Sequence, residues 1–371
     1  MKPAPTEDND TPDAGSSAVL TIPNRLTMQA SSKAAPAVTV IIPHLRNRPM
    51  LDACLDALRK TTFTGFAVLV IDNGGKDSDL AGLESRHPDV VVLRLPANAG
   101  YAGGCNAGLR QVSSPYVVFL NDDTVVEPDW LARLVEAAEG DPAVGALQPK
   151  ILSLPERRKG RRVFDYAGAA GGLIDRLGYP YCLGRSFAGR EEDSGQYDQP
   201  RDLFWASGVA LFTRREVVER LGGFEEGFFM HMEEIDLCWR MLLAGYKVRS
   251  MPQSVVWHEG GASLQEGSPL KIYYNHRNAL LMLLRNRSAA PLALLLAPRL
   301  MLEVAAMLFY LAGGKDGIAR AAQVARAFID VLRRLPETLR QRRAIQRTRT
   351  VSDRELFRNA PLSIFLPRRP D

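Results

Sequence analysis

Short apolar runs alternate with helix-like segments along the first third of the chain. Four runs rich in β-branched and aromatic residues predict buried strands at residues 38–43, 66–72, 90–95 and 116–120. A continuous apolar run is typical of a strand that is buried on both faces. Helices are predicted at residues 49–60 and 77–86, from about residue 103, and at residues 128–139. This alternation predicts an α/β fold with a mostly parallel sheet and helices on both faces.

The middle of the chain has a less regular pattern. Residues 153–200 are rich in Gly, Arg and Asp and show no clear period, so we expect an extended loop or a small β insertion over the sheet. Beyond this insertion the pattern predicts strands at residues 205–213, 247–251 and 254–257, and helices at residues 215–221 and 233–244.

The pattern changes again after His258. Residues 271–284 and 291–311 are apolar and helical, and the second segment is about long enough to cross a bilayer, which takes ~20 residues. However, Pro298 interrupts it, and Arg299 and Glu303 lie one turn apart in its middle, where charges are costly in lipid. We therefore expect a helix in the membrane interface or a shallow re-entrant hairpin rather than a full span. The alternative is a soluble helical subdomain that packs on the rest of the chain or on a second protomer.

Charge is unevenly distributed along the chain. The 371 residues carry a net charge of +5, yet the part from Arg285 onward has 17 Lys and Arg residues against 7 Asp and Glu. A basic region beside apolar segments favours an anionic membrane surface as the partner, and no nucleic acid. The four cysteines form no Cys-x-x-Cys pair, which argues against a zinc site or a disulfide framework. The first residues lack an apolar core, so we expect no secretory signal.

Two adjacent carboxylates, Asp122 and Asp123, closely follow the predicted strand 116–120. They repel each other and cost desolvation energy when they are buried. In an open α/β sheet, ligands bind at the carboxyl ends of the strands. Because carboxylate oxygens suit Mg²⁺ or Mn²⁺, the pair favours a divalent cation that holds a nucleotide diphosphate. The alternative is a solvated turn, or the cap of the helix that begins near Pro128.

Three further segments carry residues that suit a binding site. Asp72 ends the second predicted strand, where a carboxylate can accept hydrogen bonds from a nucleotide, although a turn Asp would have the same pattern. The glycine-rich loop 98–108 lets the backbone approach a ligand closely, and its spacing matches neither a dinucleotide motif nor a P-loop. His258 follows a short strand and could be a metal ligand, although a lone His is more often structural.

Glu233 and Glu234 fall in the first turn of a predicted helix, where the helix dipole favours negative charge. Asp236 and Arg240 are four residues apart on the same helix, and we expect them to pair on its exposed face. This structural explanation suits Asp236 better than two adjacent glutamates that follow aromatic residues. A carboxylate beside an apolar wall has a raised pKa and can serve as a general base.

Seven segments of the chain, taken in order, resemble an inverting family-2 glycosyltransferase of the GT-A fold. They are VTVIIP, LVIDNGGKDS, NAGYAGGCNAG, FLNDDT, WASGVALFTRR, LGGFEEGFFMHMEEIDLCWR and VWHEGG, and they run from about Val38 to Gly261. Within that family the chain is most similar to the rhamnosyltransferase-type enzymes of bacterial cell-surface polysaccharide synthesis. Those enzymes often carry a Tyr-Tyr-x-x-Arg-Asn segment after the catalytic domain, which residues 273–278 match.

The resemblance implies roles on the donor side. Asp72 would bind the nucleotide base, with Pro43 and Arg46 lining the same pocket, and Asp122 would contribute to the donor site. Further donor-binding positions fall within the matched segments, at Asn98, Gly100, Gly104, Asn106, Ser207 and Gly208.

The resemblance also implies the metal ligands and the base. Asp123 would bind Mg²⁺ or Mn²⁺, and His258 would complete that site. Glu234 would be the general base, with Glu233 beside it. Two positions depart from the family pattern: Asn121 stands where the family has the first acid of Asp-x-Asp, and a Glu-Glu pair replaces the usual Glu-Asp. No Gln-x-x-Arg-Trp motif occurs, which argues against a processive synthase.

The resemblance therefore implies transfer of one sugar from a nucleotide-diphospho-sugar to a hydroxyl acceptor, with inversion. Rhamnose is the family-level expectation for the sugar, UDP-sugars are the next donors to consider, and the acceptor would be a polyprenyl-linked glycan. The alternatives are a non-catalytic nucleotide-binding or membrane-scaffold protein that retains the fold, and a nucleotidyltransferase. We expect a location on the cytoplasmic face of the inner membrane, peripheral or monotopic, and a homo-oligomer is compatible with the sequence.

The same considerations divide the chain into three regions. Residues 1–36 are expected to form a disordered arm, because they are rich in Pro, Ala, Ser, Thr and Asp. Residues 37–265 are expected to form the GT-A catalytic domain, and residues 266–371 an apolar and basic helical region.

Overall fold

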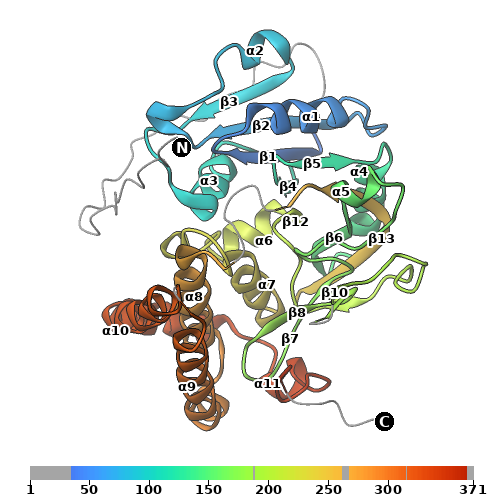
Figure 1. Ribbon diagram of the computed structural model, residues 1–371. Helices are drawn as coiled ribbons and strands as arrows, with labels where there is room; N and C mark the ends of the chain where they lie inside the picture. The colour runs from blue at the N-terminus through green and yellow to red at the C-terminus, as the bar shows by residue number, and fades with distance from the viewer. Residues whose placement is uncertain (1–34, 187–188, 261–266, 315, 366–371) are drawn as a thin grey trace, which may run out of the picture.

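The computed structural model describes residues 35–186, 189–260, 267–314 and 316–365 (Figure 1). The expected N-terminal arm lies outside the described residues, apart from its last two. The centre of the molecule is a nine-stranded sheet in which the strands follow the order β11-β13-β6-β12-β4-β1-β2-β3, with β5 paired to β13 off this path. These strands are β1 (Val38–His44), β2 (Phe66–Asp72), β3 (Val90–Arg94), β4 (Tyr116–Leu120), β5 (Thr124–Val126), β6 (Val144–Ser153), β11 (Asp202–Leu203), β12 (Ala210–Arg214) and β13 (Lys247–His258).

Helices cover both faces of the sheet and extend beyond it at the C-terminal end. They are α1 (Arg48–Leu58), α2 (Leu83–Arg86), α3 (Gly100–Leu109), α4 (Trp130–Gly140), α5 (Leu154–Arg157), α6 (Arg215–Arg220), α7 (Glu233–Leu243), α8 (Pro269–Asn286), α9 (Ala289–Leu311), α10 (Gly317–Thr348) and α11 (Asp353–Leu356). Two short 3₁₀ turns, η1 (Gly75–Asp77) and η2 (Glu226–Phe228), precede α2 and α7.

The sheet is parallel in one half and mixed in the other. Strands β3, β2, β1 and β4 are all parallel, as the strand–helix alternation predicts. Strand β12 then runs antiparallel to both β4 and β6. The fold is therefore the mixed α/β type, and the mostly parallel arrangement expected from the sequence holds for the first four strands.

Alternation along β1 places the two halves of the core. Val40 and Ile42 face the side that α1 and α4 cover, where Leu51 and Trp130 are fully buried. Ile41 faces the other side and packs in the cluster that contains α3, α6 and α7. Because successive side chains of a strand point to opposite faces, one continuous apolar run serves both halves of the core.

Several elements differ from the sequence prediction. The helix expected at residues 77–86 is reduced to η1 and the single turn α2, and the strand expected from residue 205 begins only at Ala210. The two strands expected between residues 247 and 257 are one strand, β13, with an irregularity between Met251 and Val255. The sequence did not predict β6, which is 10 residues long, and gave no bounds for the 32-residue helix α10 within the region expected to be helical.

The insertion 153–200 contains two small hairpins, in keeping with the expected small β insertion. They are formed by β7 (Gly172–Ile174) with β8 (Pro180–Cys182), and by β9 (Arg185–Ser186) with β10 (Gly189–Arg190). Figure 1 shows β7, β8 and β10 below β6 and β13, and residues of both hairpins line one cavity together with residues of α7, α8 and α9.

The C-terminal helices pack on the sheet-containing part of the chain through α8. Figure 1 shows α8, α9 and α10 gathered on one side of the sheet, with α9 extending away from it. Helix α9 is the one described helix that is long and apolar enough to cross a membrane, a test that helices of soluble proteins also pass. Its charged residues Arg299 and Glu303 are each only 1% exposed and pair with each other, with 2.6 Å between Nη2 and the carboxylate. These charges face protein, so they impose no cost on the exposed face of α9.

The outer face of α9 is apolar and exposed. Met301 is 73% exposed and Phe309 is 77% exposed, although both are large hydrophobic side chains. Helix α9 therefore presents its polar pair to the protein and its apolar side chains to the surroundings, the reverse of a soluble amphipathic helix.

Candidate active site

The carboxyl ends of three parallel strands converge at one edge of the sheet. His44 ends β1 and is paired in register with Asp72, which ends β2. Asp122 follows β4, which pairs with the other side of β1. The strand ends therefore bring together side chains that are far apart in the sequence, as an open α/β sheet requires of a ligand site.

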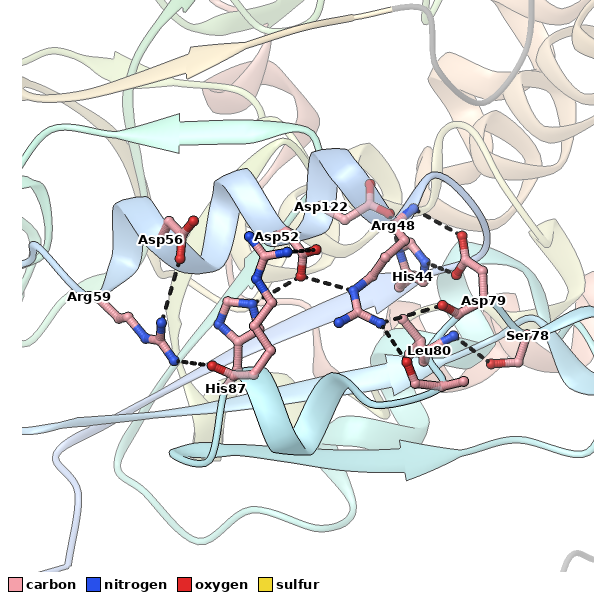
Figure 2. Close-up of polar contacts among 12 residues, drawn as sticks. His44, Arg48, Asp52, Asp56, Arg59, Ser78, Asp79, Leu80, His87 and Asp122 are labelled. Atoms are coloured by element: carbon pink, nitrogen blue, oxygen red, sulfur yellow. Dashed lines mark hydrogen bonds and ion pairs between the residues drawn. The ribbon is translucent and has the colours of Figure 1, made fainter.

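His44 lies between two carboxylates (Figure 2). Its Nδ1 is 2.6 Å from Asp122 Oδ2 and its Nε2 is 2.7 Å from Asp79 Oδ1. Burial lowers the pKa of His44, but the hydrogen bonds and charges of Asp122 and Asp79 outweigh it and raise the pKa above its usual value. Asp122 is therefore held by His44, a residue of the protein itself. His44 was not identified from the sequence, although a His that ends a buried strand, beside another strand that ends in acidic residues, is a usable signal.

Asp72 is buried and held by its own turn. The Ser78 hydroxyl donates to Asp72 Oδ2 at 2.6 Å, and the Gly74 N–H donates to Oδ1 at 3.1 Å. Arg46 is on the surface with its side chain 73% exposed and reaches Asp77 at 3.6 Å. Of the expected base-binding residues, Asp72 and Pro43 are on the strand ends, whereas Arg46 points to solvent.

The glycine-rich segment forms α3 and contacts the loop before α7. Gly100 is the first residue of α3, and its N–H donates to Asn98 Oδ1 at 2.9 Å. Gly100 has φ +71°, and a Cβ on it would lie 2.3 Å from the Phe229 carbonyl oxygen. Glycine is required here for a close approach of two backbone segments. Gly104 lies against Pro43, with 3.4 Å from the position of a Cβ to the Pro43 Cβ.

Asn106 has an internal partner for each of its polar atoms. Its Nδ2 donates to the Phe224 carbonyl oxygen at 2.9 Å, and its Oδ1 accepts from the Phe224 N–H at 2.9 Å. A second contact from Nδ2 reaches Glu226 at 3.0 Å. The structure therefore places Asn106 as a tether between α3 and η2.

Ser207 and Gly208 lie between the insertion and α3. Ser207 is buried, its N–H donates to Gln148 Oε1 at 2.9 Å, and its hydroxyl donates to the Ala167 carbonyl oxygen at 3.2 Å. The Gly208 carbonyl oxygen accepts from the Tyr101 hydroxyl at 2.6 Å. Ser207 and Gly208 therefore link β6, the insertion and α3 through these hydrogen bonds.

Asp123 and His258 meet at the end of β13. Asp123 Oδ1 is 3.1 Å from His258 Nε2, and on the other side of the ring Nδ1 is 2.9 Å from Asp165 Oδ2. All three residues are buried. Burial lowers the pKa of His258, but the carboxylates of Asp123 and Asp165 raise it to about 10. The sequence predicted Asp123 and His258 at one site, and Asp165 is an addition from the insertion.

The side chains of Asp123 and His258 offer the kinds of ligand atom, a carboxylate oxygen and an imidazole nitrogen, that a divalent cation can bind. Asp123 Oδ1 is a buried oxygen without a hydrogen bond, despite its short ion-pair distance to His258. A ligating His usually has its second ring nitrogen held by a carboxylate, which is the position of Asp165. Asn121 Nδ2 is 3.4 Å from His258 Nε2 and supplies no charge. Among the described residues no group of three or more His, Cys, Asp or Glu side chains could hold a metal ion, so a metal bound by Asp123 and His258 would draw its remaining ligands from water or substrate.

Glu233 and Glu234 begin α7 and have different surroundings. Glu234 lines a cavity of about 1150 Å³, and Glu233 is not part of the wall of that cavity. Glu233 lies near Cys105: burial first, and the charge of Glu233 second, raise the pKa of the Cys105 thiol. Each glutamate has a buried Oε2 without a hydrogen bond. Burial raises the pKa of Glu234 to about 7, against backbone hydrogen bonds that lower it. Burial and the charge of Glu234 raise the pKa of Glu233 well above its usual value.

The loop that presents these glutamates has a strained backbone. Phe229, His231 and Met232 have φ values of 66°, 67° and 73°, which non-glycine residues rarely adopt. Such conformations persist where surrounding structure enforces them, and they concentrate at functional sites.

Helix α8 supplies that enforcement through the Arg-Asn of the Tyr-Tyr-x-x-Arg-Asn segment. Asn278 Nδ2 is within 3.0 Å of the carbonyl oxygens of Phe228, Met230 and His231. Arg277 Nη2 donates to the carbonyl oxygens of Gly227 and Phe228, each at 2.9 Å. The loop is thus held by a helix that follows the central sheet in the chain.

Asp236 and Arg240 form a buried ion pair, which corrects the expectation that they pair on an exposed face. Arg240 Nε is 2.8 Å from Asp236 Oδ2, and the two residues are 4% and 0% exposed. Asn286 and Arg285 of α8 reach the other oxygen of Asp236, at 2.7 and 3.4 Å. The pair is buried because α8 covers that side of α7.

Comparisons with known proteins extend these observations. Residues 39–221 match the model of glycosyl transferase family 2. The chain is 29% identical over 266 residues to a pre-mycofactocin glycosyltransferase of Mycobacterium tuberculosis (strain CDC 1551 / Oshkosh), a match that covers 69% of this chain and 50% of that protein. It is 29% identical over 252 residues to an N-acetylglucosaminyl-diphospho-decaprenol L-rhamnosyltransferase of the same strain, covering 63% of this chain and 80% of the relative. The chain therefore spans about half the length of the first relative.

Among solved structures, the crystal structure of GalNAc-T7 with UDP, GalNAc and Mn²⁺ superposes with a TM-score of 0.51. The sequence identity is 17%, and the match covers 67% of this chain and 48% of that chain. At this identity the likeness concerns the fold alone.

Proposed function

We propose that this chain, which carries a family-2 glycosyltransferase domain with the GT-A fold, transfers one sugar from a nucleotide-diphospho-sugar to a hydroxyl group, with inversion. The observation that carries the proposal is Glu234. It has a buried oxygen without a partner, it lines the cavity, and burial raises its pKa to about 7. A carboxylate with a pKa near the working pH is suited to general-base catalysis.

In the proposed reaction, Glu234 accepts the proton of the acceptor hydroxyl while the oxygen of that hydroxyl forms a bond to the anomeric carbon of the sugar. The bond from that carbon to the diphosphate breaks on the opposite face, and a nucleoside diphosphate leaves. Asp123 and His258 would hold Mg²⁺ or Mn²⁺, with Asp165 fixing the His258 ring; when bound, the cation supplies positive charge to the leaving diphosphate. Glu233 lies next to Glu234, and burial and the charge of Glu234 raise the pKa of Glu233 well above its usual value.

We propose a polyprenyl-linked glycan as the acceptor and rhamnose as the sugar. The relative named for rhamnosyl transfer to a diphospho-decaprenol substrate supports both parts. We also propose that the protein works on the cytoplasmic face of a membrane, peripherally or as a monotopic protein. The exposed apolar face of α9 and the basic C-terminal region support this placement.

Release of free nucleoside diphosphate tests the proposal. The purified full-length chain is incubated with a panel of nucleotide-sugars, dTDP-rhamnose first, with Mn²⁺ and a membrane-lipid extract. We expect nucleoside diphosphate to appear with one donor. Release of pyrophosphate would instead support a nucleotidyltransferase, and nucleotide binding without release from any donor would support a non-catalytic protein.

A further inference from the structure

Two cationic side chains converge on Tyr166 at the wall of the cavity that contains Glu234. The Arg185 guanidinium, from β9, lies 3.3 Å from the centre of the Tyr166 ring, and its Nη1 donates to the Tyr166 carbonyl oxygen at 3.0 Å. The Lys271 ammonium, from α8, lies 5.9 Å from the same ring centre. All three residues line the cavity.

Neither cation has a carboxylate partner within ion-pair distance in the described part of the chain. Other cations of the same wall are paired, as Arg190 is with Glu156 and Arg299 with Glu303. Two like charges near one ring and inside a cavity repel each other more strongly than they would in water. An anion between them would remove that repulsion.

The position of the two cations separates them from the expected donor site. Neither Asp123 nor His258 lines this cavity, although Asp165, which holds His258, is next to Tyr166 in the chain. The cavity is instead bounded by Glu234 and by Arg299 and Glu303 of α9. Successive residues of a helix are about 100° apart around its axis, so Met301, two residues after Arg299, lies about 200° from it. Met301 therefore points away from Arg299 and lies on the exposed apolar face of α9.

We propose that Arg185 and Lys271 bind the diphosphate group of a lipid-linked acceptor, an inference that rests on the proposed function. A planar guanidinium stacked on an aromatic ring and a flexible ammonium together suit the oxygens of a diphosphate. The glycan would then extend toward Glu234, beside aromatic side chains of the cavity such as Tyr181 and Trp205.

Farnesyl diphosphate is a short probe of this chemistry. Its binding to the full-length chain is measured by tryptophan fluorescence in EDTA, which removes any cation-dependent binding at the donor site. Farnesyl monophosphate and farnesol are compared with it. We expect farnesyl diphosphate to bind most tightly and farnesol at least tenfold more weakly. The double variant Arg185→Gln/Lys271→Gln should lose about tenfold or more in affinity for farnesyl diphosphate, while its affinity for farnesol and for a nucleoside diphosphate with Mn²⁺ stays the same.

Lys60→Gln, which removes an exposed charge at the end of α1, is the control for net charge and should bind like the wild type. The proposal is overturned if farnesyl diphosphate does not bind, if farnesol binds equally well, or if the double variant keeps its affinity for farnesyl diphosphate. Loss of nucleoside diphosphate binding in the double variant would also overturn it, because the cations would then belong to the donor site. This experiment measures binding and not turnover. A protein without transferase activity could therefore still bind farnesyl diphosphate, and the failure of one proposal can be told from the failure of the other.

Discussion

The side-chain amide of Asn278, on α8, lies 2.8 Å from the carbonyl oxygen of His231, in the loop that precedes α7. His231 has φ +67° and is two residues before Glu233. Helix α8, which lies later in the sequence, therefore holds the strained backbone from which α7 starts.

We expect Asn278→Ala to act on catalysis more than on donor binding. The loop would lose the donor shared by three carbonyl oxygens, and the position of Glu234 would become less defined. A base displaced by about 1 Å can cost ~10²-fold in rate. The measurement is kcat for sugar transfer, together with the Kd for nucleoside diphosphate, which should stay within about twofold.

Asn286→Ala is the matched control for that prediction. Asn286 is also a buried asparagine on α8, but its side-chain amide donates to Asp236 and to the Met282 carbonyl oxygen rather than to the carbonyl oxygens of the strained loop. Its loss should lower the melting temperature with a smaller effect on kcat measured well below that temperature. Equal losses of kcat in both variants would mean that α8 acts only through stability.

Activity should rise with pH through the pKa of Glu234. The base works in its ionised form, and burial raises its pKa to about 7. We therefore expect kcat/KM to increase from about pH 5.5 and to level off above about pH 8. A profile that stays flat across this range in the wild type would contradict the role of a base with a raised pKa.

The same shift fixes the sign of a stability effect. A carboxyl group whose pKa is raised from 4.5 to about 7 favours the folded state below pH 4.5, and this contribution is lost as the pH rises through 7. Glu234→Gln removes the titration. The variant should match the wild type near pH 4.5 and exceed it at pH 8 by at most about 3 kcal/mol in the free energy of unfolding. Urea unfolding at both pH values measures the difference.

The first half of the sheet could be predicted from the sequence because its strands are continuous apolar runs bounded by turn residues. The observed bounds of β2 and β4 are the predicted ones. Strand β6 could not be predicted in this way, because buried polar side chains and Pro149 interrupt its pattern. Lys150, for example, is only 5% exposed and pairs with Asp193 and Asp198 of the insertion. Such partners exist only in the tertiary structure.

The candidate site shows the same division. The matched segments placed Asp123, His258 and Glu234 at their strand and helix ends. They did not identify Asp165, which lies in the irregular insertion, or the internal use of Asn106. Likewise, the hydropathy of α9 could not show that Arg299 and Glu303 face the protein, because that depends on the docking of α9 against Tyr179 and His276.

Asp165→Asn should weaken metal binding without removing a ligand. The Asp165 carboxylate fixes the ring of His258, and loss of such an outer partner typically costs about 10–100-fold in metal affinity. Mn²⁺ binding followed by electron paramagnetic resonance measures this change in the free protein. An unchanged Mn²⁺ affinity in Asp165→Asn, or an unchanged rate of transfer in EDTA, would argue against this metal site.

Membrane attachment should depend on the outer face of α9. Met301→Glu/Phe309→Glu places two charges on that exposed apolar face. We expect the wild type to sediment with anionic vesicles, more weakly at high salt because charges are screened over about 8–10 Å at physiological ionic strength, and the variant to remain in the supernatant. Lys60→Glu, which changes charge away from α9, should sediment like the wild type. Wild-type protein that stays in the supernatant at low salt would contradict the placement.

Turnover of Glu234→Gln against Glu233→Gln, with the identified donor and acceptor, tests the central assignment most directly. Glu234 lines the cavity, and Glu233 does not. Loss of a general base typically costs ~10²–10⁴-fold. The account predicts a loss of this size in kcat for Glu234→Gln, with nucleoside diphosphate affinity retained, and a much smaller loss for Glu233→Gln. Near-normal turnover of purified Glu234→Gln would contradict the account and move the base to another carboxylate.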